Sequence, residues 1–518
     1  MAAGVRGRDP RAGAPEHTER VVSRRWLALG VLCLSLLAIV IDNTIVNVAL
    51  PTLVRDLDAD VSELQWVVDA YTLVFAGLLL VAGALGDRYG RRLTLLVGLA
   101  VFGAASGWAA YAGGVDGLII ARAVMGAGAA FIMPATLSLL ISVFPDERER
   151  ALAVGIWAAT AGLGVALGPV VGGVLLDHFW WGSIFIVNVP LVAVAIVAGP
   201  RLLPESRDPV VRRIDWLGAA LSGVGLVTLV WAIIEAPTAG WTSATVLSAG
   251  ALAAALLVAF VVRQRRTAEP LLDVHLFADP RFTAAVGTIT VLFFALFGFL
   301  FLSTQYLQFV LGYSPSAAGV RVLPYAGAMI VFAPLSSALV ARFGTKRVVT
   351  VGMALFAAGL AVAATLTTDA GYGRLAITFV LMGAGMGLAG APATESIMGS
   401  LPPARANIGS AVNDTTRELG GALGVAIVGS IMASLGGGNA QSAQEAFVHA
   451  MSRASFTVAV IAALGAVLAW RYLPARPDTT GVTSRHGAER ENRGTAAAVG
   501  QRAGLGQGLG DAGAGDAG

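Results

Sequence analysis

The sequence is poor in the residues that soluble enzymes use at their surfaces and in their active sites. Only 13% of its 518 residues are charged, whereas a soluble domain has about 25%. It contains one cysteine, Cys33, and one lysine, Lys346. A single cysteine excludes an intrachain disulfide and a thiolate framework for zinc. The low charge excludes an ordinary water-soluble protein, because too few polar side chains remain to cover its surface.

Known catalytic and nucleotide-binding patterns are also missing. No histidine lies in an HExxH pattern or in a serine, histidine and aspartate arrangement that would indicate a hydrolase. No GxxxxGK[ST] loop is present, so nothing indicates ATP as a source of energy. We therefore expect neither an enzyme nor a metal site. The five histidines are scattered over tails and loops, at His17, His178, His275, His449 and His486.

Apolar sequence is what the chain has in abundance. Hydrophobic residues make up 56% of it, and its mean hydropathy is +0.75. Several apolar stretches approach or exceed about 18 residues, which is the length of a membrane-spanning helix. The first is too long for the apolar segment of a cleavable signal peptide, so we interpret it as a span. Fourteen spans are predicted, at 26–50, 64–85, 93–112, 117–143, 151–176, 183–200, 215–236, 244–262, 282–311, 318–341, 348–367, 375–400, 408–435 and 454–470.

The positions of the basic residues predict the orientation of these spans. Cytoplasmic segments of multi-pass membrane proteins are rich in lysine and arginine. With both termini in the cytoplasm, 29 of the 35 basic residues fall in cytoplasmic segments and only 3 in external loops. If one span had been missed or added, basic residues would be divided more evenly between the cytoplasmic and the external segments. The class is therefore an all-α polytopic membrane protein with both termini cytoplasmic, in which the second and thirteenth spans are the weakest predictions because they contain charges.

A short internal repeat indicates two related halves. The segment 83–92, GALGDRYGRR, follows the second span, and a degenerate copy, ARFGTKR at 341–347, follows the tenth. Each segment by itself is typical of a charged hairpin. Repetition at corresponding positions is instead typical of transporters that are built from two parallel repeats.

Several motifs on these spans resemble one family. Together they are similar to the major facilitator superfamily, and within it to the fourteen-span drug:proton antiporters, the branch of quaternary-ammonium and multidrug exporters. The resemblance covers about residues 25–470 and departs from the family pattern at Met125, where glutamine is usual. The segments that carry it are IDNTIVNVALP at 41–51, WVVDAYTL at 66–73, RAVMGAGAA at 122–130, the GVALGPVVGG antiporter motif at 164–173, and parts of 180–190 and 305–315.

The resemblance implies the domain organisation and the activity. It implies six-helix bundles at 26–200 and 282–470, two extra central helices within 215–262 that face lipid, a cytoplasmic tail at 1–25 and a disordered cytoplasmic tail at 471–518. A member of this branch would be a functional monomer in a bacterial cytoplasmic membrane. It would use a proton gradient and no cofactor to export hydrophobic or cationic drugs by alternating access. Two alternatives remain: a dedicated exporter of one endogenous metabolite or antibiotic, and a non-transporting sensor with the same fold.

Two charged residues in the first half are candidates for proton coupling. Asp42 lies well inside the first span, where an ionised carboxylate is expensive and therefore indicates function. Its alternative role is a helix contact satisfied by Asn43 or Asn47. Arg122, in the fourth span, matches an arginine that the family uses in coupling, and a fixed cation favours the ionised form of a nearby carboxylate. Its alternative role is a side chain that extends to the membrane surface.

The second half carries a group of acids that are candidates for the substrate site. In the thirteenth span, Asp414 and Glu418 are four residues apart and share one helix face, and Arg417 can pair with Asp414. This group is either a self-neutralised structural network or a second site for protons and substrate. Glu395, in the twelfth span, has no cation near it in the sequence, so it is a candidate for attracting a cationic substrate.

The second span adds three weaker candidates for the same cavity. Asp69 is either a cavity residue or part of a wet vestibule. Trp66 and Tyr71 carry aromatic rings that can stack on a planar cation, as does Phe294 in the ninth span. The alternative for each ring is ordinary packing.

Two glycine-rich motifs are candidates for conformational gating. In the fifth span, glycines four residues apart permit close helix packing and need no chemical role. In the turn after the second span, glycines and charges form a tight hairpin. The gating candidates are Gly83, Asp87, Arg88, Gly90 and Arg91 in the turn, and Gly164, Gly168, Pro169, Gly172 and Gly173 in the fifth span.

Overall fold

The computed structural model describes residues 14–207, 215–267, 269–401, 406–435 and 443–473, and in these ranges it contains helices and no strands. Thirteen of the helical segments are long and apolar enough to cross a membrane. The predicted span at 408–435 corresponds to a further helix, α15 (Ala406–Leu435), which carries three charged residues in its first half. The chain is therefore a multi-pass α-helical membrane protein, as the sequence predicts.

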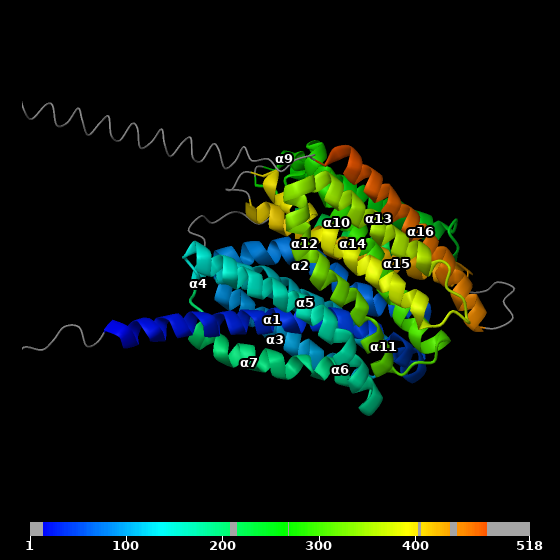
Figure 1. Ribbon diagram of the computed structural model, residues 1–518, viewed down its shortest axis with the longest axis horizontal. Coiled ribbons are helices and arrows are strands. Elements are labelled where there is room, and N and C mark those ends of the chain that lie inside the picture. The colour runs from blue at the N-terminus through cyan, green and yellow to red at the C-terminus, as the bar shows by residue number, and fades with distance from the viewer. Residues whose placement is uncertain (1–13, 208–214, 268, 402–405, 436–442, 474–518) are drawn as a thin grey trace, which may run out of the picture.

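The first half of the chain forms one bundle (Figure 1). Its first helix begins at Ala14, well before the predicted span at 26, and residues 1–13 of the predicted tail lie outside the described ranges. The sixth predicted span consists of two helices, a short one and a longer one. The helices of this N-terminal bundle are α1 (Ala14–Leu57), α2 (Val61–Tyr89), α3 (Arg91–Ala110), α4 (Val115–Val143), α5 (Glu147–His178), α6 (Ser183–Ile186) and α7 (Asn188–Leu202).

The second half forms the C-terminal bundle beside the first. Two of its predicted spans are each divided into two helices. The span at 282–311 consists of α10 followed by η2, a turn of π-helix, and the span at 318–341 consists of α11 and α12. After Leu473, the predicted tail lies outside the described residues. The helices are α10 (Pro280–Gln305), η2 (Tyr306–Val310), α11 (Pro315–Arg321), α12 (Leu323–Phe343), α13 (Thr345–Ala363), α14 (Tyr372–Gly399), α15 and α16 (Ala443–Tyr472).

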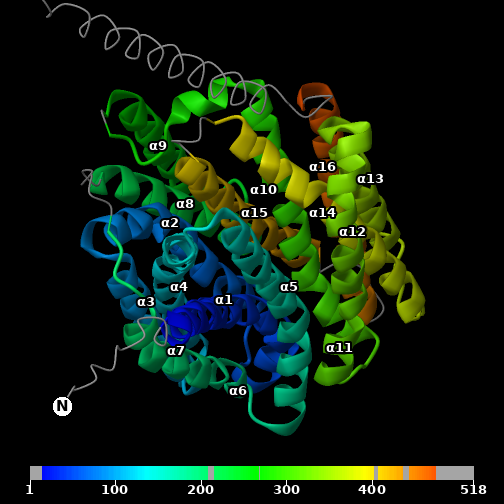
Figure 2. The same cartoon turned by 60° about the vertical axis from the view of Figure 1, so that its left-hand side comes forward.

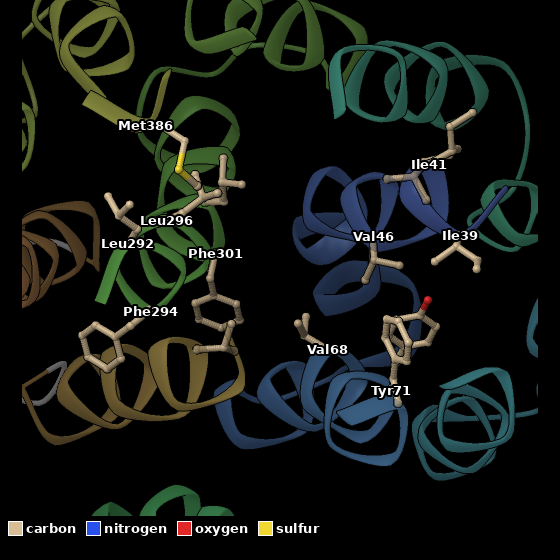
Figure 3. Packing of buried hydrophobic residues seen from close by; sticks show 14 of the residues in the cluster. Ile39, Ile41, Val46, Val68, Tyr71, Leu292, Phe294, Leu296, Phe301 and Met386 are labelled. Carbon is tan, nitrogen blue, oxygen red and sulfur yellow. The ribbon is translucent and has the colours of Figure 1, made fainter. Parts of the chain in front are cut away.

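The two bundles meet along two seams, one between α2 and α15 and one between α5 and α11. Figure 2 shows the blue and cyan N-terminal helices on one side of this boundary and the green to red C-terminal helices on the other. In Figure 3, the labelled apolar side chains form a group from α1 and α2 and a group from α10 and α14, with Val68 and Phe301 facing the boundary. The apolar core therefore extends through both bundles and across the region where they meet.

Hydrogen bonds between the bundles gather at one end of the molecule. We call the end where α2 meets α3 the basic end, which the charge distribution predicts to be cytoplasmic, and the other the opposite end. In the described residues, side chains of one bundle donate to the other at the opposite end: Thr304 to the carbonyl of Asn47 (2.6 Å), and Gln308 to that of Val48 (2.8 Å). The structure is therefore held closed at the opposite end.

Two extra helices, α8 (Trp216–Ala239) and α9 (Ala244–Arg266), stand between the bundles in sequence. α8 packs against both α2 and α15, and Ser430 donates a 2.7 Å hydrogen bond to the carbonyl of Ile233. α9 packs against α8, and most of its surface is exposed. An apolar face of α8 therefore covers the α2–α15 seam, while most residues of this helix, like those of α9, are not buried, so that the lipid-facing position of the two helices stays a prediction.

The α8–α9 hairpin is fastened at the basic end by a polar contact. Asp215 precedes α8 and accepts a bond from the backbone N–H of Gly218 (2.9 Å). Arg263 and Gln264 of α9 donate to the two oxygens of the same carboxylate at 2.7 and 2.9 Å. These contacts fix the start of α8 against the end of α9, so the hairpin is attached to the bundles as one unit.

Candidate functional site

An ion pair inside the N-terminal bundle joins two candidates from the sequence. The Asp42 and Arg122 side chains are 0% and 1% exposed, and the Arg122 Nη1 and Asp42 Oδ2 atoms are 2.5 Å apart. The guanidinium also donates from Nε to the backbone carbonyl of Val67 at 3.0 Å. The pair thus connects α1, α4 and α2. Asn43 and Asn47 do not provide the contact that the alternative for Asp42 requires, and Arg122 does not extend to a surface.

Asn188, at the start of α7, completes this pair. Its Nδ2 donates to the second carboxylate oxygen of Asp42 at 2.9 Å and lies 3.5 Å from the hydroxyl of Ser106. Both oxygens of Asp42 are therefore hydrogen-bonded by side chains from other helices. The sequence analysis did not select Asn188. The available signal was an amide residue between valines in an apolar span, but a buried asparagine by itself does not show which residue it contacts.

Tyr71 lies against the arginine of this pair. The Arg122 guanidinium carbon is 4.3 Å from the centre of the Tyr71 ring and 6.0 Å from that of Phe185. Such contacts stabilise a cation more strongly where water is excluded. Tyr71 is fully buried, and its hydroxyl has no hydrogen-bond partner in the described residues. The Tyr71 ring therefore lies against Arg122, and its stacking on a substrate stays a prediction.

The acids of the C-terminal bundle form a looser group. The Arg417 Nη1 and Asp414 Oδ1 atoms are 4.0 Å apart, and their side chains are 40% and 23% exposed. The amide of Asn413 donates to Asp414 at 3.3 Å and accepts from Thr394 of α14 at 3.0 Å. The Arg417 guanidinium also lies 4.5 Å from the ring of Phe293 on α10. This group is partly open and incompletely paired, unlike the Asp42 pair.

Glu418 belongs to the same helix as this group, α15, which packs against α2 of the other bundle. One of its carboxylate oxygens, Oε2, is buried without a hydrogen-bond partner in the described part of the chain. The two clusters therefore lie on helices of bundles that meet at the α2–α15 seam.

Three further candidates form no hydrogen bond or ion pair with either cluster in the described residues. Glu395 is exposed, and Thr394 beside it makes the contact to α15. Trp66 packs against an apolar cluster formed by α2, α8 and α15, so this ring faces the extra helix. Asp69 is fully buried, and neither of its carboxylate oxygens has a hydrogen-bond partner among the described residues. The structure therefore does not join these side chains to the Asp414 group, and Phe294 is part of the apolar core.

The gating motif after α2 is held within its own bundle. Asp87 accepts two bonds from Arg91, at 2.8 and 3.0 Å. Gly90 has a φ of 121°, which disfavours residues with a side chain, and a Cβ there would meet Glu205. Arg88 lies over the ring of Tyr89, and Gly83 faces Pro134 of α4. The hairpin thus joins α2, α3 and the segment after α7 into one rigid end.

The glycines of α5 pack on two different partners. A Cβ at Gly164, Gly168 or Gly172 would collide with side chains of α1, namely Val40, Thr44 and Ile45. A Cβ at Gly173 would instead collide with the backbone of α11 at Pro315, and one at Gly319 of α11 with the carbonyl of Pro169. The motif therefore allows close packing inside one bundle and, at the opposite end, close approach between the bundles.

Comparison with known proteins agrees with this architecture. The family model described as Major Facilitator Superfamily matches residues 32–425 and 325–504. The chain belongs to the major facilitator superfamily. As a member of this family it is a membrane transporter and not an enzyme, and in the described residues no three histidine, cysteine or acidic side chains gather as they would around a metal ion.

Named relatives cover most of the chain. It is 38% identical to the multidrug efflux pump LfrA of Mycolicibacterium smegmatis, over 81% of this chain and 83% of that protein. It is 36% identical to the tetracenomycin C resistance and export protein of Streptomyces glaucescens, over 79% and 76% of the two chains. The methylenomycin A resistance protein of Streptomyces coelicolor is 33% identical, over 85% and 90%.

Solved transporters share the fold. A bacterial homologue of the human lysosomal transporter Spinster, described as inward-facing and unoccupied, superimposes with a TM-score of 0.62 at 16% identity, over 86% of this chain and 96% of that one. The nucleoside transporter NupG superimposes with a TM-score of 0.61 at 12% identity, over 86% and 100%. The two-bundle arrangement is thus common to transporters with little sequence in common.

Proposed function

We propose that this protein is a proton-coupled antiporter that exports hydrophobic or cationic drugs across a bacterial cytoplasmic membrane. The observation that carries the proposal is the sealed Asp42–Arg122 pair, with Asn188 on the second carboxylate oxygen. A buried pair of this kind rarely contributes more stability than apolar side chains of the same volume. Its value for a transporter is that one proton on Asp42 cancels the attraction that joins α1 to α4.

The geometry supports a cycle in which the pair forms and breaks. A proton that reaches Asp42 neutralises the carboxylate and leaves the Arg122 cation without its partner. That cation then favours any arrangement that brings it to water or to another acid, and Glu418 is an acid on α15, the helix of the other bundle that packs against α2. Release of the proton restores the pair. The sum of these steps is alternating access driven by a proton gradient, with no cofactor.

The Asp414 group supports a preference for cationic substrates. It offers two carboxylates and one guanidinium on α15, so its net charge is negative, and it is partly exposed. The ring of Phe293 beside it provides an apolar surface on which Arg417 rests. A cation with a planar apolar body would meet both features here. The names of LfrA and of other multidrug resistance relatives are consistent with such substrates.

The experiment that tests the proposal uses purified protein in liposomes that enclose a pH-sensitive dye. Ethidium, a biscationic dye and a neutral antibiotic are added one at a time, with and without an imposed proton gradient. We expect proton movement on addition of the cations, and its loss in Asp42→Asn. Transport that continues unchanged in Asp42→Asn would contradict the coupling role of the pair.

One relative favours a narrower second candidate. The tetracenomycin C resistance and export protein is named for a single antibiotic, and it is nearly as similar to this chain as LfrA is. A dedicated exporter would keep the Asp42–Arg122 pair and use the Asp414 group for one compound. This candidate would be favoured if none of the three probes moved protons and one other antibiotic did. A non-transporting sensor would show no movement with any compound.

A further inference from the structure

Asp69 is a buried acid that the Asp42 pair does not use. It is 0% exposed, and neither carboxylate oxygen has a hydrogen-bond partner among the described residues. Tyr71, which lies against Arg122, is two residues further along α2. Residues two apart in an α-helix project in nearly opposite directions, because each residue turns the helix by about 100°. The carboxylate of Asp69 therefore lies on the other side of α2 from the Asp42 pair.

That side of α2 faces the other bundle and the extra helix. Residues four apart share a helix face, so Asp69 lies between Gln65 and Leu73. Gln65 donates from Nε2 to the backbone carbonyls of Ala426 (2.8 Å) and Val425 (3.4 Å) on α15. Leu73 packs in an apolar cluster that includes residues of α8 and α15. Asp69 is thus enclosed where α2, α15 and α8 meet, which we call the three-helix junction.

No described charged side chain forms an ion pair or a hydrogen bond with Asp69. Arg122 and Asp42 bond to each other instead. The other charged residues in the described parts of α2 and the helices packed against it are Arg24, Arg25 and Arg55 and Asp56 of α1, Glu63, Asp87 and Arg88 of α2, Arg91 and Arg92 of α3, Asp116 of α4, Glu235 of α8, and Asp414, Arg417 and Glu418 of α15.

An ionised carboxylate cannot remain in such a place without a partner, whereas a neutral carboxyl group can. The junction is part of the α2–α15 seam, which is bonded at the opposite end by Gln65. If alternating access parts this seam at the opposite end, water reaches Asp69 and the group can ionise. Closure of the seam must then wait for a proton.

We propose that Asp69 is a second proton-binding site, built into the three-helix junction, which takes up a proton when the opposite end closes and releases it to the same side when that end opens. Such a proton does not cross the membrane. It makes closure depend on the pH at the opposite end, while the transported proton uses Asp42. This inference rests on the proposed alternating access, and it gives α8 a role as the cover that keeps water from the junction.

The test measures the distance between the bundles at the opposite end, without substrate. Cys33 is replaced by alanine, and spin labels are placed at Asp56 near the end of α1 and at Asp369 between α13 and α14, which are both exposed. We expect a short distance between the two labels when the opposite end is closed and a long one when it is open. In detergent or lipid, the labelled protein that keeps Asp69 should shift from the short to the long distance as the pH rises. Asp69→Asn should stay at the short distance at every pH. Asp69→Glu, which keeps an acid, should restore the shift with a displaced midpoint.

Two controls separate this site from the coupling pair and from simple weakening of the seam. Gln65→Leu removes the hydrogen bonds to α15 but no charge, so it should favour the long distance by roughly fivefold and keep the dependence on pH. Asp42→Asn should also keep the shift, although it stops proton-driven transport. A distance that changes with pH to the same extent in Asp69→Asn as in wild type would overturn the proposal.

The number of protons moved per substrate supplies the second readout. Asp69→Asn should leave this ratio unchanged, because its proton returns to the side from which it came. A lower ratio would show that Asp69 carries a transported proton, which contradicts the proposal. Since the distances are measured without substrate, a protein that transports none of the probes would refute the proposed export and still test this site.

Discussion

The two bundles carry charged clusters of opposite design. In the N-terminal bundle, Asp42 and Arg122 are sealed from water and every oxygen of the carboxylate is bonded. In the C-terminal bundle, Asp414 and Arg417 are partly exposed and 4.0 Å apart, and one oxygen of Glu418 has no partner in the described residues. Similar residue types thus occur in a closed, satisfied cluster and in an open, unsatisfied one.

This difference separates two tasks that a transporter must perform. A closed pair responds strongly to one proton, because in a low dielectric the loss of one charge removes a large attraction. It has no room for a substrate. An open cluster responds weakly to a proton, because water screens its charges, but it can exchange water for a ligand. We therefore expect changes in the closed cluster to affect coupling and stability, and changes in the open cluster to affect the choice of substrate.

The largest effect should come from neutralising the closed cluster. Asp42→Asn keeps the size of the side chain and removes the charge that a proton would cancel, so proton-driven export should fall to the level of protein-free liposomes. The matched change in the open cluster, Asp414→Asn, should leave coupled proton movement measurable. The change in fluorescence of the pH-sensitive dye enclosed in the liposomes measures proton movement by the two variants. Equal losses in both variants would remove the distinction between the clusters.

Breaking the closed pair from the other side should destabilise the protein. Arg122→Met leaves the Asp42 carboxylate buried with no cation, which costs about 3–5 kcal/mol in free energy of unfolding. Adding Asp42→Asn removes the unpaired buried carboxylate, so the double variant should recover most of the lost free energy of unfolding. Thermal unfolding in detergent measures all three variants. A double variant as unstable as Arg122→Met would show that the loss comes from packing.

Much of the fold was predictable because its signals are local. Each apolar run predicts one span, and each of the fourteen predicted ranges overlaps one or two helices of the structure, whereas the orientation predicted from the basic residues stays a prediction. The divided spans, such as α6 and α7, were not predicted, because a short break costs little hydropathy. The contact of α8 with the α2–α15 seam was also not predicted, since its uniformly apolar sequence does not show which face lies against protein.

The site was predictable only in part, because its partners are distant in sequence. Asp42 and Arg122 were predicted to act together, because the motif around Arg122 resembles one whose arginine the family uses in coupling, and because a fixed cation favours an ionised carboxylate. Asn188 and the stacking of Tyr71 on Arg122 depend on the angle at which helices pack, which no spacing records. Asp69 and Trp66 were selected because one is an acid inside a span and the other carries an aromatic ring, and neither signal shows that Trp66 packs against α8 and α15.

An intermediate effect is expected where the open cluster meets the substrate. Glu418→Gln removes one of two carboxylates and should weaken binding of a cationic dye by about tenfold, or about 1.4 kcal/mol. Binding of a neutral antibiotic should change less than about twofold. Fluorescence titration with ethidium and competition by the neutral compound measure both affinities. Equal weakening of both ligands would mean that Glu418 shapes the site and does not act through its charge.

The smallest effect should come from an acid that belongs to neither cluster. Glu395 is exposed. The neighbouring residue, Thr394, forms the hydrogen bond to Asn413 of α15. Glu395→Gln should therefore change cation affinity less than about twofold, because a single exposed charge in water attracts weakly. The same ethidium titration compares it with Glu418→Gln. A tenfold loss in Glu395→Gln would extend the open cluster from α15 to α14, because an exposed carboxylate affects binding to that extent only by direct contact with the ligand.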